Sequence, residues 1–289
     1  MPSLKDIKRR ITTVRKTQQI TRAMRMVAGA KLRRAQQAVE AARPYADAMR
    51  ATLTEVARAQ KDAEHPLLTP HESVRAVELL VVTSDRGLCG AFNVNALKFA
   101  QGVIASRAGV SLTITTAGRK ANEFFRRRFP GSIGADYPQQ TWVRYEQAAE
   151  IGKRLAERYA SGQVDEVVLV YNEFVSAISQ KPREVRLLPF TVAGEDKGET
   201  AGEAPLPYEI EPSPQTLLEV LVPKAVETEI YRALLENQVG EHAARMTAME
   251  AATSNTEELI SSLTLKYNRA RQAAITKELV EIVSGAEAL

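Results

Sequence analysis

Ile275-Thr276-Lys277-Glu278-Leu279-Val280-Glu281-Ile282-Val283-Ser284-Gly285-Ala286-Glu287-Ala288-Leu289 closes the chain, and the uninterrupted segment that it ends decides the fold. No proline follows Pro223 and Gly240 is the only interior glycine, so the pattern predicts one helix from about residue 224 to residue 284. At roughly 1.5 Å per residue, this helix would be on the order of 90 Å long. Residues 3–43 likewise lack proline and contain a single glycine, Gly29. Two long terminal helices around a shorter middle predict a rod with a body attached.

The net charge of +4 on the 289 residues is unevenly distributed. Residues 1–34 hold eleven Lys and Arg against one acid, Asp6, which gives +10 there and leaves −6 for the remainder. A helix with charge of one sign suits nucleic acid, anionic lipid or an acidic protein surface. No apolar run approaches the roughly 20 residues needed to span a bilayer. The N-terminus lacks a signal peptide, and the single cysteine, Cys89, permits no internal disulfide, so we expect a cytoplasmic protein.

Apolar residues recur at alternating spacings of three and four in both terminal segments, which is typical of a coiled coil. The N-terminal stripe shows phase breaks between residues 14 and 20 and between residues 27 and 35, and comprises Leu4, Ile7, Ile11, Val14, Ile20, Met24, Val27, Ala35, Val39, Ala42, Ala46, Met49, Leu53 and Val56. The C-terminal stripe comprises Ile260, Leu263, Tyr267, Ala270 and Ala274. The simplest arrangement is an antiparallel coiled coil with four methionines in its seam, namely Met24, Met26, Met246 and Met249.

The middle of the chain is predicted to be α/β. Apolar runs predict strands at 76–83 and 165–171, a third strand is predicted at 111–116, and helical patterns fall at 93–107, 118–128 and 145–160. Strands that alternate with helices argue for a mostly parallel sheet. Residues 174–180 and 183–190, separated by Lys181-Pro182, are predicted as a hairpin on its edge, and Gly194–Pro207 as a loop.

The predicted fold class is therefore α/β, with a long antiparallel coiled coil of the N- and C-terminal helices and an inserted Rossmann-like domain. The expected boundaries are 1–60 for the first helix, 74–192 for the body, 193–212 for a loop and 213–289 for the last helix.

The turn Ser84–Asn93 is the strongest candidate for chemistry, because a glycine-bearing passage from strand to helix can hold a phosphate. It matches neither G-x-G-x-x-G nor G-x-x-x-x-G-K-[ST], and we interpret it as a tight structural turn. Cys89 lies in this turn without a histidine nearby, and the three histidines, His65, His71 and His242, are scattered. We expect no catalytic, cofactor-binding or metal site, and no chemistry by the chain itself.

The chain resembles the gamma subunit of F-type ATP synthases. The ending Ile275-Thr276-x-Glu278-x-x-Glu281-x-x-x-Gly285-Ala286 looks like that family's signature. Four further stretches are similar, in order along the chain: Ile20–Lys31, Arg43–Tyr45, Asp85–Asn93 and Ala244–Asn255. The resemblance implies a central rotor shaft that couples proton flow to ATP synthesis or hydrolysis on its partners and regulates their ATPase activity. Since chloroplast gamma subunits carry a cysteine-bearing insertion, Cys89 alone implies a bacterial type without thiol control.

The resemblance also implies partners and contacts. These are the alpha and beta subunits, the epsilon subunit and the ring of c subunits, without nucleic acid, at the cytoplasmic face of the bacterial inner membrane. Contact with acidic loops of beta is carried over from the family onto Arg271, Gln272 and Thr276. Charge alone adds Arg9, Arg10, Arg22 and Arg25 as candidate contacts.

Two alternatives compete with this interpretation. The first is a nucleotide-binding enzyme with a Rossmann-like body and helical arms. The second is a nucleic-acid-binding coiled coil that uses residues 5–34, although no aromatic side chain precedes Tyr45 for base stacking. Neither alternative accounts for the last fifteen residues.

Overall fold

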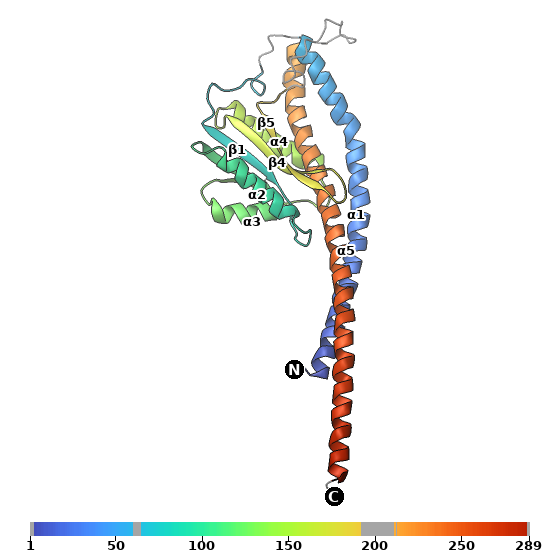
Figure 1. Cartoon of the computed structure of the whole chain (residues 1–289). Coiled ribbons are helices and arrows are strands. Elements are labelled where there is room, and N and C mark those ends of the chain that lie inside the picture. Colours follow the sequence, from blue (N-terminus) through green and yellow to red (C-terminus); the bar gives the residue numbers. More distant parts are fainter. Residues whose placement is uncertain (1–2, 60–64, 192–210, 212, 288–289) are drawn as a thin grey trace. The chain divides into compact units, whose positions relative to one another are not determined.

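The computed structural model of the chain describes residues 3–59, 65–191, 211 and 213–287 (Figure 1). The chain forms two compact units, the first of residues 1–30 with 245–289 and the second of residues 31–244. Helix α1 (Leu4–Ala59) and helix α5 (Pro214–Glu287) each contribute to both units. The sequence predicted that the two long helices form a coil separate from the body, but residues 31–59 of α1 and 214–244 of α5 belong to the body. The loop predicted at 194–207 lies outside the described residues.

Side chains just outside each long helix fix where it begins. The Ser3 hydroxyl accepts a hydrogen bond from the backbone N–H of Asp6 at 3.2 Å, and the Asp6 carboxylate accepts one from the Ser3 N–H at 3.1 Å. This is a reciprocal capping arrangement, and its hydrogen bonds lower the pKa of Asp6. Ser213 caps α5 in a similar way through the N–H of Thr216, and Pro214 takes the first helical position, which needs no N–H donor.

Both long helices contain a proline in their interior. α1 continues through Pro44, which lies inside the first predicted helix of residues 1–60, and α5 continues through Pro223, whereas the sequence pattern predicted a helix that begins after this proline. A proline inside a helix removes one backbone hydrogen bond and bends the helix at a cost of about 3 kcal/mol. Tertiary packing of the rest of each helix offsets this cost.

The body is built on a five-stranded sheet in the order β3-β2-β1-β4-β5. Three strands lie where the sequence predicted them, namely β1 (Ala76–Val82), β2 (Ser111–Ala117) and β4 (Glu166–Phe174). They pair in parallel, with Leu80 of β1 opposite both Thr115 of β2 and Leu169 of β4. The helices α2 (Phe92–Ala105), α3 (Arg119–Arg128) and α4 (Tyr145–Ala160) also confirm the sequence prediction. The mostly parallel α/β sheet is therefore confirmed.

The two outer strands differ from the prediction. The hairpin was expected to turn at Lys181-Pro182, but it turns at residues 175–179, and Pro182 pairs with Asn172 inside β5 (Gln180–Leu188). β5 is an edge strand, where a residue without an N–H donor is tolerated. β3 (Ile133–Tyr137), on the other edge, was not predicted, because its five residues carry no continuous apolar run.

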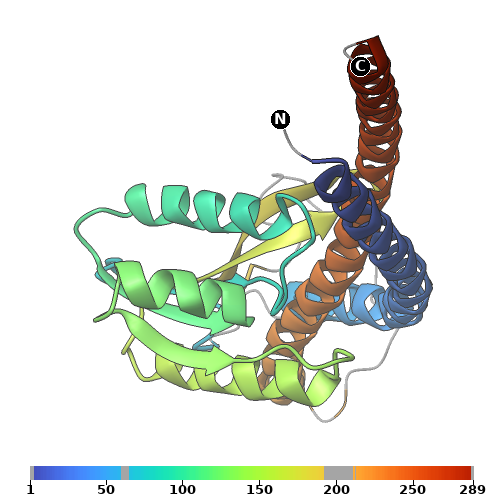
Figure 2. The ribbon, with the colours of Figure 1, turned by 90° about the horizontal axis from the view of Figure 1, so that it is seen from below.

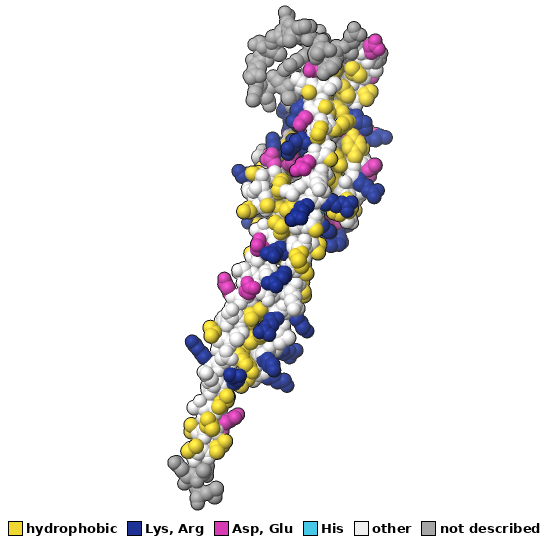
Figure 3. All heavy atoms as spheres, turned by 90° about the vertical axis from the view of Figure 1, so that its right-hand side faces the viewer, with side chains coloured by type: hydrophobic (Ala, Val, Ile, Leu, Met, Phe, Trp, Pro, Cys, Tyr) yellow, Lys and Arg dark blue, Asp and Glu magenta, His cyan; other side chains and the backbone are white. Residues whose placement is uncertain are grey.

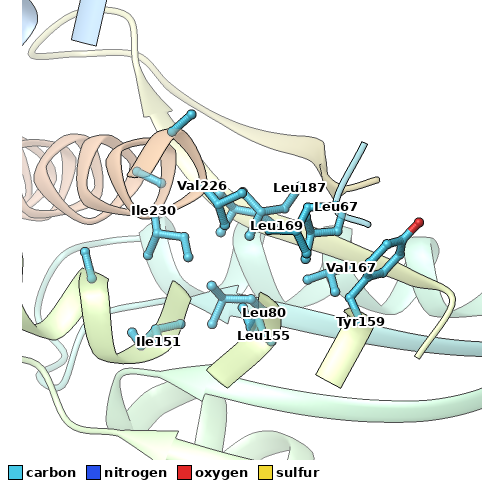
Figure 4. Close-up of a cluster of buried hydrophobic side chains, with 14 of the residues drawn as sticks. Leu67, Leu80, Ile151, Leu155, Tyr159, Val167, Leu169, Leu187, Val226 and Ile230 are labelled. Atoms are coloured by element: carbon cyan, nitrogen blue, oxygen red, sulfur yellow. The ribbon is translucent and has the colours of Figure 1, made fainter. Parts of the chain in front are cut away.

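Helices cover both faces of the sheet, and the strands bury side chains on both. Val77, Leu79 and Val81 of β1 face α2 and α3, together with Leu97 and Phe125 of these helices. Leu80 and Val82 point the other way, into a core shared with α4 and with residues 218–234 of α5. Figure 4 shows Leu80 in this core with Leu155 and Val226, and Figure 2 shows α4 on the opposite side of the sheet from α2 and α3. Successive side chains of β1 point to opposite faces, and both faces are covered by helices. The sequence of this strand is therefore an almost continuous apolar run.

One charged side chain lies inside this sheet. Glu78 of β1 is fully buried and accepts hydrogen bonds from Arg154 Nη1 at 2.8 Å and from Arg158 Nε at 2.6 Å, both on α4. The Thr115 hydroxyl donates a third, at 2.6 Å. A buried carboxylate is tolerated only when it is paired and hydrogen-bonded. The cluster therefore fixes how α4 lies on the sheet.

Beyond residues 218–234, α5 passes close to the carboxyl ends of the strands. Asn237 is fully buried, and its Nδ2 donates to the carbonyl oxygen of Thr83, just beyond β1, at 3.3 Å. At Gly240 an added Cβ would lie 2.9 Å from Cε2 of Phe92, the first residue of α2, and 3.3 Å from Cγ of Gln180. Only glycine lets the helix approach this closely.

The core position of α5 gives a direct test. Ile230 is fully buried in α5, whereas Val220, on the same helix, is 58% exposed. We expect Ile230→Ala to lower the free energy of unfolding by about 2–5 kcal/mol, because it removes packed methylene groups and leaves a cavity. Val220→Ala should change it by less than about 0.5 kcal/mol. Urea unfolding of the full chain measures both, and equal effects would contradict the placement of α5.

Two helical glycines should respond to alanine with opposite signs. Gly102 of α2 has no atom within 4 Å of an added Cβ, so Gly102→Ala should stabilise the protein by about 0.5–1 kcal/mol through helix propensity. Gly240→Ala gains the same propensity but forces the contact with Phe92 to open, an overpacking cost of about 1–3 kcal/mol. Thermal unfolding of both variants checks this, and a stabilised Gly240→Ala chain would contradict the close approach.

Candidate functional site

The crevice at the carboxyl ends of β1 and β4 is the first place to look for a ligand. The strand order reverses there, and open α/β sheets bind nucleotides at such a switch point. In this chain Asn237 and Gly240 of α5 occupy the crevice, and Asn172 of β4 donates to the carbonyl oxygen of Phe92 at 3.1 Å. The protein's own helix therefore fills the position that a dinucleotide takes in related sheets, which argues against a nucleotide-binding enzyme.

The turn Ser84–Asn93 closes on itself beside this crevice. The side chain of Asn93 accepts from the Ser84 N–H at 3.0 Å and donates to the Ser84 hydroxyl at 2.8 Å. Leu88, with φ 63°, and Gly90, with φ 58°, both adopt the left-handed conformation that a tight turn requires. The interpretation as a structural turn agrees with this geometry.

Neighbouring groups contact the side chains of Cys89, His65 and His71. Cys89 is buried and its Sγ lies 3.3 Å from Asn93 Nδ2. His65 Nδ1 accepts from the Leu67 N–H at 3.1 Å, and burial lowers its pKa. His71 stacks on Tyr159 and contacts Asp165 at 2.9 Å. Within the described part of the chain, no group of three or more His, Cys, Asp and Glu is arranged to hold a metal ion.

The first unit is an antiparallel pair of helix segments, residues 4–30 of α1 and residues 245–287 of α5. Arg25 Nη1 lies 3.1 Å from Glu250 Oε1, and Arg22 Nη2 lies 3.8 Å from Glu257 Oε1. Residue numbers therefore increase along one helix as they decrease along the other, as in an antiparallel pair. Between the helices the hydroxyls of Thr21 and Thr253 are 2.8 Å apart. The antiparallel coiled coil of this unit is confirmed.

The seam of this coil differs from the predicted stripe. Ile20, Val27 and Met26 were expected in the seam, but they are 60%, 56% and 62% exposed. The more buried positions keep one unbroken three–four rhythm, namely Ile7, Ile11, Val14, Gln18, Thr21, Arg25 and Ala28. The phase breaks were therefore an error that arose because polar side chains occupy seam positions. Of the other methionines, Met249 is buried, Met24 and Met246 are half-buried, and Sδ of Met246 would lie 3.6 Å from a Cβ added at Gly29.

The distal part of α5 is almost uncovered. Every side chain from Ile275 to Ser284 is exposed, and five of these are large aliphatic groups with exposed fractions between 49% and 69%, namely Ile275, Leu279, Val280, Ile282 and Val283. Figure 3 shows hydrophobic side chains gathered at this end of the helix. Contiguous exposed apolar surface marks an interaction site. This surface was not singled out from the sequence, although its dense aliphatic pattern is visible there.

The seven residues predicted to contact a partner fall into three groups. Arg271, Gln272 and Thr276 are exposed within one and a half turns of α5, next to the aliphatic surface. Arg9 and Arg10 are exposed near the start of α1 and form no ion pair with another described residue. Arg22 and Arg25 point across the coil to Glu257 and Glu250. The structure thus brings the first three together and engages the last two internally.

The second unit has a cavity of about 530 Å³ between residues 38–50 of α1 and 228–236 of α5. Ala35 and Leu53 of α1 are both buried, but the predicted seam residues Val39, Ala42 and Ala46 between them are only half-buried. The cavity wall includes Tyr45, Tyr145, Tyr231 and Arg50. Tyr145 donates to Glu227 at 2.6 Å, and burial together with this carboxylate raises its pKa to about 12. Tyrosine and arginine around an apolar floor are typical of protein interfaces.

None of the helices in the described ranges combines the length and the apolar character that a transmembrane span requires.

Solved structures share this architecture. The chain aligns with a chain of the Euglena gracilis mitochondrial ATP synthase rotor with a TM-score of 0.67 and 22% identity, covering 94% of this chain and 98% of that one. It also aligns with a chain of the central stalk and c-ring of the Tetrahymena thermophila mitochondrial ATP synthase, with a TM-score of 0.61, 25% identity, and coverage of 81% and 99%.

Sequence comparison identifies the family. A family model described as ATP synthase matches residues 3–289. The ATP synthase gamma chain of Heliobacterium modesticaldum is 49% identical over the full length of both chains. That of Chlorobaculum tepidum is 47% identical over 100% of this chain and 99% of the relative. These matches confirm the resemblance carried by the C-terminal signature and by the four further stretches: the chain belongs to the family of ATP synthase gamma chains.

Proposed function

We propose that this chain is the central rotor shaft of a bacterial F-type ATP synthase, which turns inside a ring of alpha and beta subunits and couples proton flow to ATP synthesis or hydrolysis. The observation that carries the proposal is the run of ten exposed residues from Ile275 to Ser284, five of them large and aliphatic. An isolated helix gains nothing by exposing these groups to water. Membership of the gamma chains supports a ring of partner subunits as the surface that receives them.

The proposal places the chemistry on the partners and not on this chain. The crevice in which a sheet of this order binds nucleotides is filled by Asn237 and Gly240 of α5. A shaft needs rigid geometry and contacts that reform at each step, and exposed ion pairs worth about 0.2–1 kcal/mol each meet this need. In this proposal the chain modulates ATPase activity mechanically.

The contacts with the acidic loops of beta are assigned to Arg271, Gln272 and Thr276, which are exposed together on α5. Arg9 and Arg10 are the better charge-based candidates, since they have no ion-pair partner among the described residues. Arg22 and Arg25 would have to leave Glu257 and Glu250 before they could bind an acidic loop. They are therefore weaker candidates, with a role in the coil itself.

The remaining partners in the proposal are epsilon and the c-ring, which would hold the chain at the cytoplasmic face of the membrane without a membrane span of its own. The cavity lined by Tyr45, Tyr145 and Tyr231 offers one protein-binding surface on the second unit. Its aromatic wall and nearby arginines have the composition of interface centres.

The assigned contact on α5 can be tested with a matched pair of arginines. Arg271→Ala should lower the ATPase activity of complexes reconstituted from alpha, beta and this chain by about 10- to 100-fold, as expected when a charge-assisted hydrogen bond of about 1.5–3 kcal/mol is lost. Arg269→Ala removes another exposed arginine two residues earlier, from another side of the helix, and should have little effect. Equal activities of the two variants would refute the assignment to Arg271.

Rotation itself is tested by a reversible cross-link. Cys89 is buried and is the only cysteine, so Leu265→Cys, at a position that is 62% exposed, introduces one accessible thiol. A disulfide from this thiol to a cysteine placed in beta should abolish ATPase activity, and reduction should restore it. A cross-linked complex that turns over at the original rate would exclude a rotating shaft. If alpha and beta do not assemble with the chain at all, the proposal fails at an earlier step.

A further inference from the structure

The cavity between α1 and α5 in the second unit has an interior large enough for a small molecule, besides the exposed rim offered above to a protein partner. Its volume of about 530 Å³ lies within the range of roughly 300–1,000 Å³ that is typical of small-molecule sites. Leu235 lines it from α5, and the wall on α1 includes small apolar side chains, namely Ala38, Val39, Ala42 and Ala46. Water against such a wall finds few hydrogen-bond partners, so an apolar molecule that displaces it gains affinity.

The aromatic side of the cavity is held in place by contacts within the protein. The rings of Tyr145 and Tyr231 meet edge to face, with centroids 5.6 Å apart and an angle of 75° between their planes. The Tyr145 hydroxyl donates to Glu227 at 2.6 Å, and the same carboxylate accepts from Lys224 Nζ at 2.8 Å. The hydroxyl of Thr228, also in the wall, donates to the Lys224 carbonyl at 2.7 Å. A wall whose groups are already fixed loses little freedom on binding, which favours affinity.

The charged groups of the wall compensate one another. Arg50 Nη2 lies 3.5 Å from Glu229 Oε2, and Arg232 pairs with the same carboxylate. Arg232 Nε also lies 4.0 Å from Glu236 Oε1, so two arginines face two glutamates without net charge. Among the described residues, the other charges of the wall are exposed and opposite in sign, namely Arg43 and Asp47. An ion that entered the cavity would exchange its hydration for groups that are already paired, which disfavours a charged ligand.

We propose that the cavity between α1 and α5 binds a neutral, mainly apolar molecule that carries an aromatic ring. The ring would pack against Tyr145 and Tyr231, because aromatic side chains favour offset and edge-to-face contact with a further ring. Such a ligand touches both helices at once, so its binding raises the stability of the second unit. The proposal goes beyond the rotary function and does not depend on it.

The site can be probed with N-phenyl-1-naphthylamine, a neutral aromatic molecule whose fluorescence rises in apolar surroundings. Titration of the full chain should show saturable binding of about one probe per chain, and the bound probe should raise the unfolding temperature. The matched probe is 8-anilinonaphthalene-1-sulfonate, which has the same rings and an added sulfonate group. We expect it to bind about tenfold more weakly, because the sulfonate must be desolvated.

Three variants locate the binding. Ala42→Phe places a ring inside the cavity and should weaken binding of the neutral probe by about tenfold or more, because the ring takes the place of the ligand. Ala48→Phe adds the same ring at an exposed position of α1 outside the wall and should leave binding unchanged. Tyr45→Ala removes a wall side chain that is 53% exposed, and should weaken binding about three- to tenfold through the loss of one aromatic contact. Thermal unfolding without the probe checks that each variant is folded, and Tyr45→Ala decides alone if Ala42→Phe is not.

The proposal is overturned if the neutral probe does not saturate, if Ala42→Phe and Ala48→Phe bind it equally, or if the sulfonate binds more tightly. The neutral probe should also stay bound when saturating epsilon subunit is added. Its displacement would mean that a protein side chain fills the interior, and would overturn the proposal as well. Assembly with alpha and beta and the ATPase activity of the complex test the rotary function separately, so a failure here leaves that function standing.

Discussion

The burial of one face of α5 against the sheet is the interaction on which the rest of the structure depends. Val222, Val226 and Ile230 lie in the same core as Leu80 and Leu169 of the sheet. Each fully buried aliphatic side chain of this kind contributes about 1.5–3 kcal/mol. The same 74-residue helix then fills the crevice of the sheet and continues into the first unit. Because helix propensity alone is marginal in water, this burial is what makes so long a helix stable.

Sequence patterns were sufficient where one physical cause acts alone. β1 and β4 are buried on both faces along most of their length, so their apolar runs predicted them within a few residues. Pro182 was misjudged because its tolerance depends on lying in an edge strand, which only the sheet order reveals. Ile20 and Val27 were misjudged because hydrophobicity was taken as the sign of a seam, whereas Thr21 satisfies its hydroxyl across the helices and is buried instead. Polar groups with partners cannot be recognised before the partners are known.

The same limit applies to the candidate site. Arg271, Gln272 and Thr276 came from a family resemblance, and the structure adds that they adjoin a helix end rich in exposed aliphatic groups. Positive charge drew attention to Arg22 and Arg25, but Glu257 and Glu250 lie more than 200 residues away in the sequence and hold them in the coil. The cavity between residues 38–50 of α1 and 228–236 of α5 could not be predicted either. It exists because the two helices are separated there, and the small residues of α1 in the sequence do not show this separation.

The occupied crevice of the sheet has a consequence for ligand binding by the body. Asn237 and Gly240 belong to a helix that is covalently continuous with the sheet. A tethered group of this kind acts at an effective concentration in the millimolar range or above. A free ligand would have to displace it against the core that anchors it. Binding at this edge of the sheet would therefore require a helix to leave its place, and not merely the filling of an empty crevice.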